Sequence, residues 1–506
     1  MEVQVLIVGA GPTGLMLACE LARRGIPHRL IERHSGPSAG SRGKGVQPRT
    51  LEILDDVGIG TEVIAGGRFG IPLLIHEGGV TKKVETCAAP RDGAAYGSTL
   101  LTPQWRVEEC LRRRLEALGG EVEWDTELVG LDDLGDQVVA RLRAGGRERD
   151  VAAGWLVGCD GGHSTVRRSL EVPFLGETLE HIRMWVGDVE VDGLDRDHWH
   201  MWRDDAGFLA LCPLRGTDDF QLQTQIAPDE TRRPSLESFQ EMVLRRTRRE
   251  DIRLTSADWT SSWRANVRMV DRLRIGRVLL AGDAAHVHSP AGAQGMNTGV
   301  QDAYNLGWKL AAAISSGRES LVNTYEEERL PIARWVLGIS SELTRTAFSP
   351  DLRRDERTMQ LDLNYCASSL SVDVDVVSAH VRAGDRAPDA IGLVGQGGRR
   401  TRLFELMQGT HTTVLTFGGD VAEVRQRLDA RFYGKVRLVN VVAQDENGSD
   451  HWIDLEGSAA RLYGPAGGAL FVIRPDGYVG LTAKPSNLAE VTRYLELIVG
   501  MTPAAG

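Results

Sequence analysis

The sequence lacks the features that indicate metal, thiol-redox or membrane chemistry. Its six cysteines are scattered, with no Cys-x-x-Cys pair and no cysteine–histidine cluster at zinc spacing. No apolar run approaches the roughly 20 residues that a membrane-spanning helix needs. The N-terminus does not show the cationic start, apolar middle and small-residue end of a signal peptide. We therefore expect a cytoplasmic protein without a metal centre and without a membrane partner.

An excess of positive charge is also absent. The chain has 59 lysines and arginines against 70 aspartates and glutamates, a net charge of −11, whereas proteins that bind nucleic acid usually present a basic surface. We therefore expect no nucleic-acid partner. With 42% hydrophobic and 25% charged residues, the composition is that of a globular protein. The length of 506 residues favours several domains, and we take three.

A pattern typical of a dinucleotide-binding unit is present near the N-terminus. The apolar run 3–8 predicts a buried strand, and a Gly-x-Gly-x-x-Gly turn from Gly9 to Gly14 follows it directly. Apolar residues at helical spacing then continue to Arg24. The next predicted strand contains Glu32, near the place where such units carry an acid that binds the ribose.

Each glycine of this turn has a physical role in holding a pyrophosphate. Gly9 permits the tight turn, Gly11 lets the backbone approach the phosphates, and Gly14 lets the helix pack closely on the strand. The phosphates then meet the unpaired N–H groups and the positive dipole end of the helix. A glycine turn in an unrelated α/β unit is the alternative, and the joint presence of strand, helix and acid makes it the weaker interpretation.

Two later segments indicate FAD rather than NAD. Residues 155–160 read as a buried strand ending at Asp160, with Ser164 as the N-cap of a following helix. Residues 276–281 read as a third strand, followed by Gly282-Asp283 and then by a long helix. The N-terminus of that helix would stabilise a bound anion or the electron-rich edge of a reduced flavin ring. An NAD site needs no such second cradle.

These segments resemble the aromatic-ring hydroxylases, the flavoprotein monooxygenases related to p-hydroxybenzoate hydroxylase, over roughly the first two thirds of the chain. The Asp-Gly motif with its later Ser and Arg matches the segment from Asp160 to Arg167, and the Gly-Asp-Ala-Ala-His motif matches the segment that begins at Gly282. The resemblance implies that the first motif lies in the cofactor region and helps NAD(P)H to engage. It also implies that Asp283 holds the ribitol of FAD and that Arg42 and Gln104 contact the cofactor.

The motifs together define the expected cofactor site. We expect it to comprise Gly9, Gly11, Pro12, Thr13, Gly14, Glu32, Arg33, Arg42, Gln104, Leu128, Asp160, Gly282, Asp283, Pro290, Gly292, Gly295, Met296 and Asn297. Structural alternatives exist, since Arg42 could be a surface cation and Asp160 a turn-former. His286 has no acid partner visible in the sequence, and we interpret it as a packed core residue.

The stretch between the second and third strand ends is rich in alternating strands, at 182–191, 197–203, 207–213 and 220–226. They predict a sheet over the flavin ring. Aromatic residues and the glutamines at 221, 223 and 225 gather there. They could form a wall of the substrate pocket. An equally weighted alternative is that the aromatic residues form an ordinary core and the glutamines a solvent-facing stripe. The candidate substrate-pocket residues are Gln47, Tyr96, Phe208, Gln223 and Pro290.

The last third of the chain predicts a separate unit. A helix over 321–348, broken near Pro331, is followed by a polar linker and by short strands at 412–417, 436–442 and 470–473. This tail resembles the thioredoxin-like C-terminal domain of phenol and polyketide hydroxylases. It lacks Cys-x-x-Cys, which excludes thiol exchange, and we expect a role in packing or dimer contact.

The predicted fold class is α/β. It combines a Rossmann-like FAD-binding domain of the glutathione-reductase type, a β-sheet substrate domain and a thioredoxin-like C-terminal domain. The expected bounds are 1–75, 98–175 and 272–370 for the first, 76–97 and 176–271 for the second, and 380–506 for the third. We expect a monomer or a homodimer.

The expected reaction follows from what the sequence leaves as electron donor and acceptor. One Gly-x-Gly-x-x-Gly occurs in a strand–helix context, so NADPH or NADH must visit the flavin transiently. Without a redox cysteine or metal the acceptor is O2, as the resemblance also implies. The resemblance further implies a flavin C4a-hydroperoxide that hydroxylates an aromatic substrate, phenolic or polycyclic polyketide, while the protein binds, orients and excludes water.

Two other functions remain open at this point. One is Baeyer–Villiger insertion or epoxidation by the same scaffold, and the other is a non-catalytic flavin-binding sensor. No obligatory catalytic acid or base is identifiable from the sequence, because the oxygen chemistry belongs to the cofactor.

Overall fold

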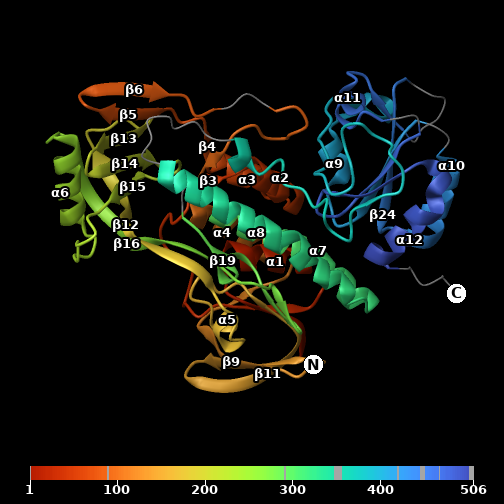
Figure 1. Cartoon of the computed structure of the whole chain (residues 1–506), viewed down its shortest axis with the longest axis horizontal. Coiled ribbons are helices and arrows are strands. Elements are labelled where there is room, and N and C mark those ends of the chain that lie inside the picture. Colours follow the sequence, from red (N-terminus) through yellow and green to blue (C-terminus); the bar gives the residue numbers. More distant parts are fainter. Residues whose placement is uncertain are drawn as a thin grey trace.

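Three eight-stranded sheets and a three-stranded sheet form the framework of the chain in a computed structural model, which describes residues 2–87, 91–289, 292–346, 356–418, 421–444, 451–465 and 468–500. Figure 1 shows the three large sheets in separate regions, with the long helices α7 and α8 between them. The fold is a mixed α/β fold, as predicted.

The first sheet positions the three predicted strand ends. Its strands run in the order β17-β18-β11-β1-β2-β8, and β9 and β10 extend it beside β11. The pairs β1–β11, β1–β2 and β11–β18 are parallel, so their carboxyl ends lie at one edge. The bounds are β1 Val3–Val8, β2 His28–Ile31, β8 Val122–Glu123, β9 Thr126–Asp133, β10 Val138–Ala144, β11 Arg147–Gly158, β17 Arg274–Ile275 and β18 Val278–Leu280.

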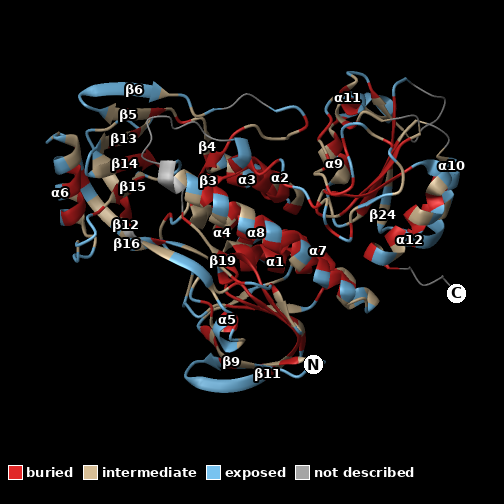
Figure 2. Cartoon of the chain, in the orientation of Figure 1, coloured by how far each residue is buried: buried red, intermediate tan, exposed pale blue. Residues whose placement is uncertain are grey.

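Two helices begin at this edge and pack against each other. They are α1, Pro12–Ala22, and α7, Gly295–Ser316. A Cβ added at Gly299 would lie 2.4 Å from Thr13 Oγ1, and one added at Gly307 would lie 2.5 Å from the Cβ of Glu20. The two glycines therefore let α7 approach α1 more closely than any other residue would allow. Figure 2 shows α7 as a largely buried helix and α8 as exposed along one side.

Helix α8, Ser320–Thr346, is continuous through Pro331, so the predicted break there is wrong. A proline inside a helix removes one backbone hydrogen bond and frees the carbonyl four residues earlier. Pro331 lies on the exposed face of α8, where water can satisfy the freed carbonyl of Glu327. The helix therefore absorbs the proline without ending.

The second sheet confirms the strands predicted in the middle of the chain. Its order is β19-β16-β12-β15-β14-β13-β5-β6. Helix α6, Leu236–Thr247, covers its outer face, where Trp185 and Trp202 form a core with Phe239. The bounds are β5 Leu73–Glu77, β6 Val80–Val84, β12 Leu175–Asp192, β13 Trp199–Asp204, β14 Gly207–Pro213, β15 Asp219–Gln225, β16 Arg253–Met269 and β19 His286–Val287.

The third sheet forms the C-terminal unit, with the order β20-β27-β26-β23-β24-β25-β21-β22. The predicted strands at 412–417, 436–442 and 470–473 are present as β23, β24 and β26. Because β20 pairs with β27, residues 372–373 of the expected linker already belong to this sheet. The bounds are β20 Val372–Asp373, β21 Leu393–Val394, β22 Arg400–Thr401, β23 Thr412–Phe417, β24 Val436–Val442, β25 Trp452–Asp454, β26 Leu470–Ile473, β27 Val479–Ala483, α9 Leu403–Met407, α10 Ala422–Phe432, α11 Ser458–Tyr463 and α12 Leu488–Val499.

The remaining elements connect the sheets. The small sheet β3-β7-β4 lies beside the helices that follow β2 in the chain. None of the helices in the described ranges is long and apolar enough to cross a membrane. The bounds are β3 Gly45–Val46, α2 Pro48–Val57, α3 Gly60–Ala65, β4 Arg68–Phe69, β7 Leu100–Leu101, α4 Gln104–Ala117 and α5 Thr165–Ser169.

The glycines of α7 and α8 predict opposite effects of the same substitution. At Gly307 an added methyl group would collide with Glu20, and overpacking of this kind costs about 1–3 kcal/mol. At Gly338, an exposed position of α8 with no atom within 4 Å of the added Cβ, alanine removes backbone entropy from the unfolded chain and contributes about 0.5–1 kcal/mol. Thermal unfolding should show a lower midpoint for Gly307→Ala and a higher one for Gly338→Ala. Equal shifts would contradict the close α1–α7 contact.

Candidate functional site

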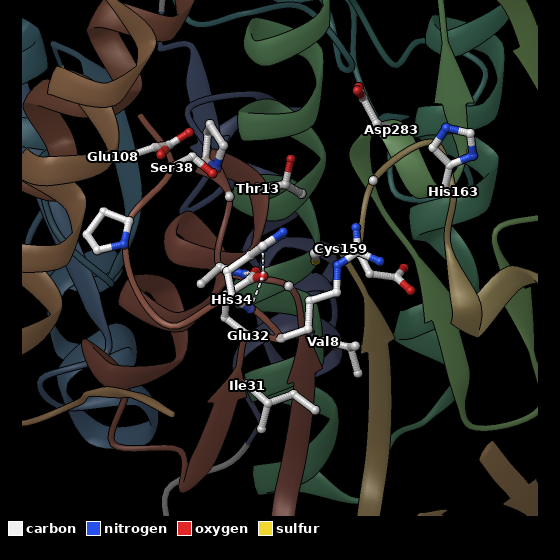
Figure 3. A pocket seen from close by; sticks show the side chains of 18 of the residues that line it. Val8, Thr13, Ile31, Glu32, His34, Ser38, Glu108, Cys159, His163 and Asp283 are labelled. Atoms are coloured by element: carbon white, nitrogen blue, oxygen red, sulfur yellow. Dashed lines mark hydrogen bonds and ion pairs between the residues drawn. The ribbon is translucent and has the colours of Figure 1, made fainter. Parts of the chain in front are cut away.

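A cavity of about 330 Å³ opens at the carboxyl ends of β1 and β11. Figure 3 shows Glu32 and His34 on one side of it and His163 and Asp283 on the other. Many of the residues predicted from the sequence line this one cavity, although they come from distant segments. They are Gly9, Gly11, Pro12, Thr13, Glu32, Arg33, Arg42, Gln104, Leu128, Asp160, Asp283, Gly295 and Met296.

The glycine turn after β1 has the geometry that a phosphate cradle needs. Gly9 has φ +103°, and a Cβ on it would lie 2.5 Å from the carbonyl oxygen of Cys159. A Cβ on Gly14 would lie 1.9 Å from the carbonyl oxygen of Gly9. A Cβ on Gly11, in contrast, would meet no atom within 4 Å. Gly9 and Gly14 therefore serve the packing of strand and helix, and Gly11 faces the open cavity.

Glu32 lies at the end of β2, opposite that turn. One carboxylate oxygen accepts the N–H of Ala10 at 2.9 Å, and the other accepts the N–H and Nδ1 of His34 at 3.1 and 2.5 Å. Burial raises the pKa of the carboxyl, and the hydrogen bonds from Ala10 and His34 outweigh this and hold it below its ordinary value. Glu32 is thus a carboxylate that can accept hydroxyl groups at the cavity wall.

The Asp160 motif joins the second strand end to the third. Asp160 Oδ2 accepts the N–H of Thr165 at 2.6 Å, and Ser164 caps α5 by accepting the N–H of Arg167 at 3.0 Å, as predicted for Ser164. The guanidinium of Arg167 then donates to the carbonyl oxygen of Ala284 at 2.8 Å. The motif therefore connects the segment after β11 to the segment after β18, and Asp160 itself also lines the cavity.

The Gly282-Asp283 turn is held by a buried charge array. Asp302 of α7 accepts the N–H of Gly282 at 3.1 Å and contacts His286 Nε2 at 2.7 Å, and Arg329 of α8 donates to its other oxygen at 2.7 Å. His286 is a buried residue, as interpreted from the sequence. It nevertheless has an acid partner, which the sequence could not reveal because Asp302 is supplied by a different element.

Asp283 lines the cavity, and its side chain is exposed there. Nearby protein atoms partly desolvate its carboxyl and raise the pKa, and the charges of His286 and Arg42 act in the opposite direction. Because the side chain is open to the cavity, a ligand hydroxyl can reach the carboxylate and donate a hydrogen bond to it.

The loop before α7 is fixed by Gln47 and Asn297. The Gln47 N–H donates to Asn297 Oδ1 at 2.8 Å, Gln47 Nε2 donates to the Gly292 carbonyl at 2.9 Å, and Asn297 Nδ2 donates to the Gly45 carbonyl at 2.9 Å. Of the expected cofactor residues, four do not line the cavity: Gly14, Gly282, Gly292 and Asn297. Pro290 lies outside the described residues.

The other substrate-pocket candidates lie in different surroundings. The Tyr96 hydroxyl donates to Asp55 of α2, and its ring stacks on Phe69 with centroids 6.4 Å apart. Phe208 lies half-buried on β14, and Gln223 on β15 donates to Gln221 Oε1 at 2.9 Å. The structure thus places Tyr96 against α2, away from the two residues of the middle sheet.

The glutamines of β15 lie on the face of the middle sheet that meets the cofactor unit. Gln221 is fully buried and donates to the carbonyl oxygen of Ser41 at 2.6 Å, while Ser41 donates through its N–H to Asp188 of β12 at 2.7 Å. The side chain of Trp259 fills the space beside Gly40. The solvent-facing alternative is therefore wrong for Gln221, which joins the sheet to the loop that carries Arg42.

Sequence reasoning missed several cavity residues. Glu108 of α4 accepts Gln104 Nε2 at 2.8 Å, and burial raises the pKa of its carboxyl. Its position one helical turn after Gln104 was the available signal. The further residues that line the cavity include His34, Ser38, Arg112, Trp124, Thr126, Glu127, His163 and Thr165.

The cavity fits an adenine dinucleotide. Its two helix N-termini, at α1 and α7, have no side-chain cap, so their first N–H groups are available to a phosphate or to the flavin ring. Gly11 leaves room for the pyrophosphate, and Glu32 and Asp283 offer carboxylates for hydroxyl groups at two separate places. FAD carries hydroxyl groups on both sides of its pyrophosphate, which matches this arrangement.

Gly11 predicts a variant that folds and yet loses its cofactor. A Cβ at this position would meet no atom within 4 Å, so we expect Gly11→Leu to keep the thermal midpoint of the FAD-free parent. Its side chain would occupy the pyrophosphate position, and we expect purified protein without bound FAD. Absorbance at 450 nm against protein concentration measures this, and a fully flavin-loaded variant would contradict the placement.

The raised pKa of Asp283 predicts a pH-dependent affinity for FAD. The ionised carboxylate accepts a hydroxyl, so affinity should fall as the pH drops through the pKa of the FAD-free protein, which lies above the ordinary 3.8. Asp283→Asn should bind FAD more weakly at pH 7 and lose the part of the acid dependence that the parent owes to this group. Fluorescence quenching of FAD measures both, and identical profiles would remove Asp283 from the site.

Comparison with known proteins agrees with this geometry. A family described as FAD binding domain matches residues 2–340. A flavin-dependent monooxygenase of Mycobacteroides abscessus is 41% identical over 505 residues, covering 98% of this chain and 100% of that protein. The 6-methylpretetramide 4-monooxygenase of Streptomyces rimosus is 33% identical over 532 residues, covering 98% and 93%.

A solved structure extends the likeness to the fold. The ternary complex of aklavinone-11 hydroxylase with FAD and aklavinone superposes with a TM-score of 0.85 at 27% identity, covering 98% of this chain and 99% of that one. Its FAD and the matched family agree with the cofactor that the cavity fits. The chain therefore belongs to the FAD-binding domain family, and it is an FAD-dependent monooxygenase.

Proposed function

We propose that this chain hydroxylates an aromatic substrate, phenolic or polycyclic polyketide, with NADPH or NADH as electron donor and O2 as oxygen donor. The observation that carries the proposal is the dinucleotide cavity, whose lining includes Arg42 on the loop that Ser41 joins to the middle sheet through its contacts with Asp188 and Gln221. FAD, once bound by these residues, would supply a hydride acceptor for NAD(P)H and a means of activating O2. The chain's own residues hold the cofactor and shield it.

The cofactor contacts that we propose follow the cavity from one end to the other. Glu32 would accept the ribose hydroxyls of the adenosine half, and the N–H groups at the start of α1 would hold the pyrophosphate. Asp283 would accept a ribitol hydroxyl, and the N-terminus of α7, at Gly295 and Met296, would face the flavin ring. Arg42, which also lines the cavity, would balance the charge of the phosphates.

The substrate would lie between the flavin ring and the inner face of the middle sheet. Gln223 is on this face, and its cross-strand neighbours are Val186 and Ala210, with Met201 opposite Ala210. This row is apolar apart from one amide, which suits a flat aromatic body with a polar substituent. The 6-methylpretetramide and aklavinone named for the relatives are compatible with such a wall.

The C-terminal unit is proposed to be a thioredoxin-like domain. Its central strands run in the order β24-β23-β26-β27, with β23 and β24 parallel and β26 antiparallel to both of its neighbours. Helix α10 connects the parallel pair and α12 follows the hairpin. Residues 380–506 contain no cysteine, which excludes thiol exchange, and we propose a role in packing or dimer contact. We propose a monomer or a homodimer.

The structure of the product distinguishes aromatic hydroxylation from two related reactions of flavin monooxygenases. Baeyer–Villiger insertion and epoxidation also add one oxygen atom, but the first converts a ketone into an ester or lactone and the second converts a double bond into an epoxide. A flavin-binding sensor would show no substrate-stimulated turnover, and the relatives are named as monooxygenases.

The proposal predicts coupled consumption of NAD(P)H and O2. With phenols and polycyclic quinones offered under ¹⁸O2, we expect at least one compound to accelerate NADPH or NADH oxidation and to yield a product that carries one ¹⁸O as an aromatic hydroxyl. The Gly11→Leu variant is the matched control without FAD. If the flavin-loaded enzyme oxidised NAD(P)H at one unchanged rate with every compound and released only hydrogen peroxide, the proposal would fail.

A further inference from the structure

The turn Arg474–Gly477 of the C-terminal unit is inserted against the long helix α7. It joins β26 to β27. Asp476 Oδ2 accepts the indole N–H of Trp308 at 3.0 Å and the amide of Asn305 at 3.2 Å. The carbonyl oxygen of Pro475 accepts the Tyr304 hydroxyl at 3.1 Å. The tail therefore binds α7 through side chains on one of its faces.

Four buried charges accompany this contact. Lys309 and Arg474 supply two positive charges, and Glu328 of α8 and Asp476 supply two negative ones, all with side chains at most 2% exposed. Glu328 contacts Lys309 Nζ at 2.6 Å and both Arg474 nitrogens at 2.7 and 2.9 Å. Buried charges of this kind are tolerated only when they are paired and hydrogen-bonded. Removal of one negative charge would leave one positive charge uncompensated.

Helix α7 is thus held from three sides. On the first side, Gly299 and Gly307 allow contact with α1. On the second, Asp302 pairs with Arg329 of α8 at 2.7 Å. On the third, Asn305 and Trp308 are bonded to Asp476. Close packing on the α1 side, an ion pair on the α8 side and hydrogen bonds on the third side together fix the position of the helix.

The position of α7 matters because its N-terminus lines the dinucleotide cavity at Gly295 and Met296. The same helix carries Asp302, which accepts the N–H of Gly282, next to Asp283. A displacement of α7 would therefore move the helix N-terminus and the Gly282-Asp283 turn together.

We infer that the Arg474–Gly477 turn is a positioning element of the flavin site. Its contacts hold α7 against α1 and thereby set the distance between the N-termini of these two helices, which would bind FAD. The inference rests on the FAD site described above and assigns the C-terminal unit a role in cofactor binding. The residues of the turn do not line the cavity and would act through α7.

A simpler alternative is that the turn only docks the tail on the rest of the chain. Other contacts between the same two regions allow the alternatives to be separated. Asp92 faces Arg461 of the C-terminal unit at 3.4 Å, with 76% and 55% of the two side chains exposed. This pair joins the two regions without contacting α7, so it is a charge-matched control for Asp476.

The test compares Asp476→Asn with Asp92→Asn. The positioning role predicts that Asp476→Asn raises the dissociation constant of FAD roughly tenfold and changes the visible circular dichroism of the bound flavin. Asp92→Asn should leave both unchanged. Asp476→Glu, which restores the charge, should recover most of the affinity and the parent spectrum.

A second variant covers the case in which Asp476→Asn does not fold. Trp308→Phe removes the indole N–H that Asp476 accepts and keeps an aromatic ring, and we expect a several-fold weaker affinity for FAD with the same spectral change. The inference is overturned if the thermal midpoint falls in the Asp476 or Trp308 variants while FAD affinity and the flavin spectrum stay at the parent values. That result would assign the turn to docking alone.

Discussion

Parallel strands that stay in register to their last residues are the constraint on which the site depends. The backbone hydrogen bonds between neighbouring strands continue one residue past the end of each strand. The N–H of Gly9 donates to Ile31, that of Cys159 to Val8, and that of Ala281 to Gly158, at 2.8, 2.8 and 3.0 Å. Three chain segments from distant parts of the sequence therefore end side by side. A cofactor long enough to span them is bound by all three, which is why one cavity collects residues from Gly9 to Met296.

The parts of this site that are local in sequence were predictable. Glycine spacing identified the turn after β1, alternating and apolar runs identified the strands, and Ser164 identified its own helix start, because each of these signals acts within a few residues. Pro331 shows the limit of local rules. Whether a proline ends a helix depends on whether its face is exposed, and exposure is decided by the tertiary structure.

The parts that depend on distant pairs were not predictable from one sequence. His286 meets Asp302 from α7, Ser41 meets Asp188 and Gln221 from the middle sheet, and Glu328 meets Arg474 from the C-terminal unit. No spacing rule connects these partners. The aromatic residues of the middle sheet were ambiguous for the same reason, and α6 resolves this by covering Trp185 and Trp202 on the outer face.

A structure of the protein with FAD bound tests the central claim most directly. We predict a single FAD per chain, with its adenosine ribose at Glu32, its pyrophosphate at the start of α1 beside Gly11, and its flavin ring between Asp283 and the N-terminus of α7. Electron density for the cofactor elsewhere, or for a dinucleotide that leaves Asp283 and the start of α7 without contact, would contradict the account.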